Sequence, residues 1–108
     1  MPDGALERQF HSKMTEIHER AARECSYHAT RFIQMVNHRG GVAAARALLH
    51  SSRPAQGLTT LWEHGRLDLS VEAHVCQLEW QDLFTGEEVA IAKKRLNDFG
   101  YDAQAVDP

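Results

Sequence analysis

Apolar side chains recur at steps of three and four residues through the first third of the chain. This spacing is typical of an amphipathic helix with charged residues on its opposite face. The recurring positions are Leu6, Phe10, Met14, Ile17, Ala21, Cys25 and Phe32. Neither Pro nor Gly occurs between Ala5 and Arg39, so the pattern fits one helix of about 30 residues or two shorter ones. We favour a break near 25–27, because Ser26 is a good N-cap and the charge pattern changes there.

Glycines and an alanine-rich run mark the next elements. The pair Gly40-Gly41 predicts the end of the preceding helix, because glycine tolerates the left-handed conformation of a C-terminal cap. A helix is predicted over 42–50, where alanine, the best helix former, predominates. A loop over 51–57 and a short helix over about 58–64 follow. The expected apolar anchors of that short helix are Leu61 and Trp62.

The last third of the chain carries the clearest local signal. Thr85 and Glu88 have the spacing of a capping box and predict a helix that buries Val89, Ala92, Leu96 and Phe99 and stops at Gly100. Before it, residues 66–69 are expected to form an extended connector, since one short strand would lack a partner. Asp68 or Ser70 can cap a helix over about 71–78, and 79–84 is expected to be a turn.

These elements predict an all-α fold, a compact bundle of five or six helices with a long N-terminal helix. A length of 108 residues suits one domain over 1–108, and the ends, 1–4 and 102–108, are expected to fray. No apolar run approaches the roughly 18 residues that span a bilayer. No basic segment followed by an apolar one begins the chain. We therefore expect a cytoplasmic protein without a membrane partner, and two reduced, buried thiols at Cys25 and Cys76.

Charge is distributed unevenly along the chain. The segment 25–62 contains no Asp or Glu, although the chain has 15 acids, and it holds four arginines. Residues 63–108 carry ten acids and four bases. Three of the arginines, Arg39, Arg46 and Arg53, are spaced seven apart. Such asymmetry suggests a partner for the basic segment, or its cover by the acidic half of the same chain.

The basic segment 38–53 is the main candidate for ligand binding. Free backbone N–H groups at Gly40 and Gly41, beside Arg39, could hold an anion. If Arg39, Arg46 and Arg53 project the same way, with His50 one turn from Arg46, they could follow a phosphate backbone. Against nucleic acid, the segment has no lysine and no aromatic residues interleave the arginines.

Signals for catalysis are weak. The seven histidines form no HExxH, no CxxC is present, and no GxSxG marks a nucleophile. Glu63 and Asp68 could act as an acid–base pair, but Arg66 lies between them and an ion-paired hinge accounts for them more simply. No metal, cofactor or catalytic residue is therefore predicted, and whether the protein is an enzyme stays open, with a non-enzyme favoured.

Several sequence blocks between Phe32 and Tyr101 carry a resemblance. They are GGVAAARALL at 40–49, GLTTLWE at 57–63, GRLDLSVE at 65–72, LFT at 83–85, AKKRL at 92–96 and FGY at 99–101. The chain resembles a widespread small bacterial all-helical domain that has no assigned function. The resemblance implies that Trp62, Glu63, Arg66, Asp68 and Glu72 belong to one shared arrangement. His74 departs from it, because an apolar residue such as leucine is expected there.

Together these features favour a non-catalytic protein-interaction or accessory module. Its expected partner is another protein, or a second copy in a homodimer formed through the long N-terminal helix. The alternative is a nucleic-acid-associated module that uses Arg39, Arg46 and Arg53. A weaker alternative is a hydrolase-like site around Glu63, Arg66, Asp68 and Glu72.

Overall fold

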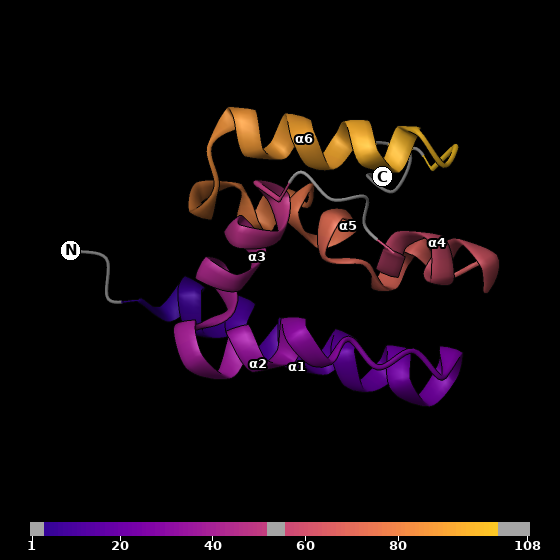
Figure 1. Cartoon of the computed structure of the whole chain (residues 1–108). Helices are drawn as coiled ribbons and strands as arrows, with labels where there is room; N and C mark the ends of the chain where they lie inside the picture. The colour runs from indigo at the N-terminus through magenta and orange to yellow at the C-terminus, as the bar shows by residue number, and fades with distance from the viewer. Residues whose placement is uncertain (1–3, 52–55, 102–108) are drawn as a thin grey trace.

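The first two helices lie side by side and form one layer of the molecule (Figure 1). The structure is a computed structural model that describes residues 4–51 and 56–101. Helix α1 spans Ala5–Cys25 and α2 spans Thr30–Arg39. The expected break is confirmed, but Ser26 closes α1 in a left-handed conformation, φ 54°, instead of capping α2. Tyr27 N–H then donates to the Ala21 carbonyl at 3.1 Å, which completes the end of α1.

Helix α3, Gly41–Leu49, starts directly against α1. Gly40 adopts φ 93°, where a side chain would be strained, and this turns the chain between α2 and α3. Gly41 lies so close to α1 that it has no room for a side chain, because a Cβ there would lie 2.6 Å from the Cα of His11. The N-terminus of α3 therefore touches the backbone of α1. Helix α4 spans Gln56–Glu63.

The segments between α4 and the last helix are short helical turns. A 3-10 helix, η1, spans Leu67–Leu69, so the expected extended connector is wrong. Helix α5 covers only Val71–Val75, and the expected turn at 79–84 belongs to a second 3-10 helix, η2, Leu78–Leu83. Hydrophobic spacing in such brief segments does not distinguish a 3-10 turn from a connector. Of the two possible caps, Ser70 acts: its hydroxyl accepts from Ala73 N–H at 3.0 Å.

The capping box is confirmed at the start of α6, Gly86–Asn97. Thr85 Oγ1 accepts from Glu88 N–H at 3.1 Å, and Glu88 Oε1 accepts from Thr85 N–H at 2.9 Å. On the apolar face, Ala92 and Leu96 are fully buried, while Val89 and Phe99 are partly buried.

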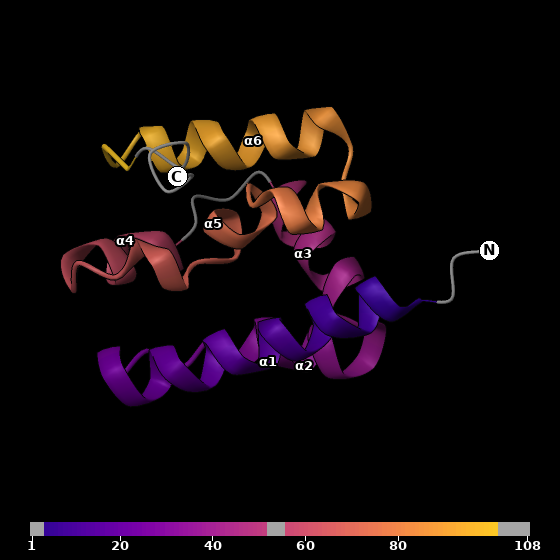
Figure 2. The same cartoon turned by 180° about the vertical axis from the view of Figure 1, so that it is seen from behind.

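The helices stack as layers around one apolar core. The α1–α2 pair forms one outer layer, α6 forms the other, and α3 and α5 lie between them in both views (Figures 1 and 2). Phe10 of α1 packs edge-on against Trp80 and Phe84, with ring centroids 5.3 and 5.2 Å apart. Both cysteines, Cys25 and Cys76, are buried and free.

The described residues contain six α-helices, two 3-10 helices and no strand, which confirms the all-α bundle with its long N-terminal helix. The radius of gyration, 13.0 Å, is that of a compact chain of about 100 residues. Within the described ranges no helix has the length and apolar character needed to cross a membrane. Apart from Gly4, the ends that were expected to fray lie outside the described residues.

Candidate binding cleft

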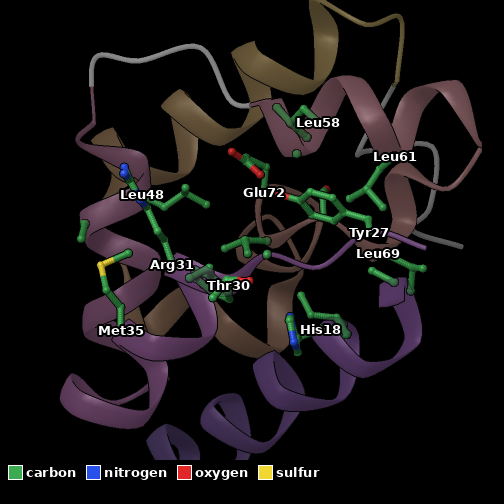
Figure 3. A pocket seen from close by; sticks show the side chains of 18 of the residues that line it. His18, Tyr27, Thr30, Arg31, Met35, Leu48, Leu58, Leu61, Leu69 and Glu72 are labelled. Atoms are coloured by element: carbon green, nitrogen blue, oxygen red, sulfur yellow. The ribbon is translucent and has the colours of Figure 1, made fainter. Parts of the chain in front are cut away.

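An open cleft of about 1370 Å³ lies between the α1–α2 layer and helices α3, α4 and α5 (Figure 3). Its walls are apolar and come from α1, α2 and the connection between them, from α3 and α4, and from η1 and α5. They consist of Ile17, Ala21, Ala29, Phe32, Met35, Ala47, Leu48, Leu58, Leu61, Leu69 and Val71. We refer to this feature as the cleft.

A buried ion pair forms the floor of the cleft. Glu72 of α5 is 2% exposed, and its Oε2 lies 3.3 Å from Nη1 of Arg95 on α6. Burial raises the pKa of Glu72, and Arg95 opposes that rise. Arg95 also donates to the carbonyls of Leu48, Leu49 and Ser51, at 3.0, 3.0 and 2.8 Å. One side chain thus balances the buried charge and caps the C-terminal end of α3.

Tyr27 reaches into the cleft from the α1–α2 connection. Its hydroxyl and the Glu72 carboxylate point toward one another (Figure 3). Burial, and then the charge of Glu72, raise the pKa of Tyr27, so the phenol stays neutral and able to donate at pH 7. A Cβ at Gly57 would lie 2.6 Å from the Tyr27 hydroxyl. Glycine at position 57 therefore leaves the space that the hydroxyl occupies.

The rim of the cleft is basic. The exposed lining residues on and before α2 include His28, Arg31, His38 and Arg39. Among the lining residues the only acid is Glu72, which Arg95 already balances. The acid-free segment 25–62 supplies most of the lining. The sequence therefore indicated the charged segment, but the cleft itself was missed because Phe32 and Met35 fit a core-facing stripe equally well.

The arginines of the predicted basic segment 38–53 lie in two different surroundings. Arg46 and His50 both meet Glu88 of α6, at 3.0 and 2.8 Å from its Oε2, whereas Arg39 lines the cleft. Arg53 lies outside the described residues. Burial alone would raise the pKa of Glu88, but the Thr85 N–H, His50 and Arg46 together hold it at about 2. The acidic half of the chain thus covers part of the basic segment.

The Gly40-Gly41 turn faces its own chain. The Gly41 N–H, one of the groups expected to hold an anion, donates to Nδ1 of His11 at 3.0 Å. The side chain of His11 thus fills the position that an anion would take at this amide. The turn serves the contact between α1 and α3.

The polar set implied by the resemblance is not one cluster. Arg66 pairs with Asp68 at 3.1 Å and with Glu24 of α1, while Glu72 lies in the cleft and Glu63 is exposed on α4. Of Glu63, Arg66, Asp68 and Glu72, only Glu72 lines the cleft, which corrects the expectation of a shared hydrolase-like pocket. Trp62 is 51% exposed against Phe99, with ring centroids 5.9 Å apart, so of the two expected anchors only Leu61 is buried, and Leu58 joins it in the core.

His74 is the polar residue that the resemblance did not lead us to expect. It lies on α5 and is 8% exposed. Its Nδ1 is buried and has no hydrogen-bond partner among the described residues. Burial, and then the charge of Lys13, lower the pKa of His74 to about 4. Burial likewise raises the pKa of the Cys76 thiol to about 11, which keeps it protonated and unreactive at pH 7.

Within the described ranges, no group of three or more histidine, cysteine or acidic side chains is arranged to hold a metal ion. Comparison with protein-family models, with curated proteins and with solved structures gives no match for the chain. The resemblance to a small bacterial helical domain therefore stays an expectation, and the cleft is the feature from which a function can be proposed.

Proposed function

We propose that the chain is a non-catalytic protein-interaction module whose cleft binds a segment of a partner polypeptide. The observation that supports this is the combination of apolar walls with an open volume of about 1370 Å³. Small-molecule sites usually enclose roughly 300–1,000 Å³. A cylinder of that 1370 Å³ volume and about 10 Å diameter corresponds to roughly three turns of α-helix.

The polar groups of the cleft favour binding over catalysis. The buried carboxylate of Glu72 is paired with Arg95, and the remaining donors of Arg95 hold the C-terminal carbonyls of α3. Both groups thus have partners within the fold, which accounts for their burial without a catalytic role.

The cleft is also a better candidate interface than α1. The apolar face of α1 is buried: Phe10 and Met14 pack in the core of its own chain, whereas Ile17 lines the cleft. A homodimer through this helix would have only its charged face to use. We therefore assign the partner to the cleft.

A displayed library of random peptides, about 18 residues or five helical turns long, tests the proposal directly. Peptides selected on the wild-type chain are measured against two matched variants of α3. Ala47→Arg places a long side chain in the cleft, whereas Ala43→Arg makes the same change at an exposed position outside it. We expect Ala47→Arg to weaken binding at least about tenfold, or about 1.4 kcal/mol, and Ala43→Arg to leave it unchanged. Circular dichroism checks that both variants fold. Equal binding to both variants, or no selected peptide at all, would refute the proposal.

A further inference from the structure

We infer that the segment held by the cleft is an acidic amphipathic helix, an inference that rests on the proposed function and specifies its partner. It follows from the contrast between the walls and the rim. The walls are apolar, whereas the exposed rim carries Arg31 and Arg39 together with His28 and His38, and no acid. An occupant that matches both has an apolar inner face and acids along the edge that faces α2.

A helix suits the cleft better than an extended strand. Strand addition needs an open sheet edge to supply main-chain hydrogen bonds, and no strand occurs among the described residues. The surfaces on both sides of the opening are helical, as Figure 3 shows. In such grooves a partner helix is held by apolar anchors at i, i+3, i+4 and i+7.

The rim also sets a spacing for the partner. Arg31 and Arg39 are eight residues apart on α2, about 12 Å along its axis. A helix lying beside α2 would meet both with two acids about two turns apart. The inner face of that helix is expected to carry no charge, because Glu72 and Arg95 already balance each other at the floor and a further buried charge would lack a partner.

The probes for this inference are the cleft-dependent peptides, which are the library peptides whose binding is weakened by Ala47→Arg but not by Ala43→Arg. We expect them to carry an excess of Asp and Glu with two acids seven or eight residues apart. For the best binder, Arg31→Glu should weaken binding about fivefold at roughly 50 mM NaCl, and the effect should shrink below about twofold at roughly 500 mM. Lys94→Glu, an equal charge change on α6 away from the cleft, should change binding little.

The outcomes separate this inference from the proposed function. Cleft-dependent peptides that lack acids, or that bind Arg31→Glu as well as the wild type, overturn the acidic helix and leave the interaction module standing. Failure to select any cleft-dependent peptide overturns both. A further experiment titrates the chain with duplex DNA. If DNA binds in a salt-sensitive way, displaces the peptide and no longer binds the Arg31→Glu variant, then nucleic acid is the ligand of the rim and the acidic helix is overturned.

Discussion

Arg95 of α6 lies 3.3 Å from the carboxylate of Glu72 on α5 while it caps the C-terminal end of α3. One guanidinium therefore joins three helices. A buried ion pair adds little stability by itself, but loss of one partner leaves an uncompensated charge. Here the same loss would also leave the carbonyls at the end of α3 without their donor.

Arg95→Ala is expected to lower the free energy of unfolding by about 2–4 kcal/mol, measured by urea denaturation. In a Glu72→Gln background the same substitution should cost less, since the buried charge is then absent. Equal costs in both backgrounds would mean that Arg95 acts only as a helix cap.

His74→Leu should make the protein less sensitive to acid. The pKa of His74 is about 4 in the folded chain against an ordinary 6.5, so the unfolded chain binds the proton more tightly. Stability is thus lost as pH falls from 6.5 toward 4, by up to about 3 kcal/mol. Thermal unfolding of the two proteins between these pH values measures the difference. Parallel pH profiles of wild type and variant would contradict it.

Glu88→Gln should weaken the attachment of α3 to α6. The carboxylate has a pKa of about 2 instead of 4.5. Its contribution to the free energy of unfolding is therefore fully present above pH 4.5 and disappears as pH falls toward 2. Because Arg46 and His50 are half exposed, we expect a loss of only about 1–2 kcal/mol at pH 7. Glu87→Gln, at an exposed position of the same first turn, is the control and should cost less than about 0.5 kcal/mol.

Gly41→Ala should destabilise the fold although alanine favours helices. Its Cβ would meet the backbone of His11 at 2.6 Å, so α1 and α3 would have to move apart, at a cost of about 1–3 kcal/mol. Gly86→Ala is the matched control, because Gly86 is also the first residue of a helix and nothing lies within 4 Å of its added Cβ. A smaller loss for Gly41→Ala than for Gly86→Ala would exclude close helix contact as the reason for this glycine.

Local signals in the sequence predicted the features that depend on neighbouring residues. The capping box at Thr85 and Glu88 and the helix end at Gly40 each involve residues within a few positions of one another. The 3-10 turn at Leu67–Leu69 was missed because three residues are too few for a period to appear.

Long-range pairing was not predictable in the same way. Arg46 and Glu88 are 42 positions apart, as are Glu24 and Arg66, and nothing in the local sequence selects these partners from the other charged residues. Charge asymmetry suggested cover by the acidic half of the chain as one alternative, but not which arginine would pair and which would stay at the cleft. The face of α2 that lines the cleft likewise has the composition of a face that packs in the core.

The contact of Gly41 with α1 has a consequence for how a partner would bind. At the other end of α3, Arg95 donates to the Leu49 carbonyl and Arg46 pairs with Glu88. These contacts and the Gly41 contact hold the helix at both ends. The side of the cleft that α3 provides is therefore preorganised, and a partner would lose little affinity to ordering this receptor. The entropy lost on association would fall mainly on the partner helix as it folds.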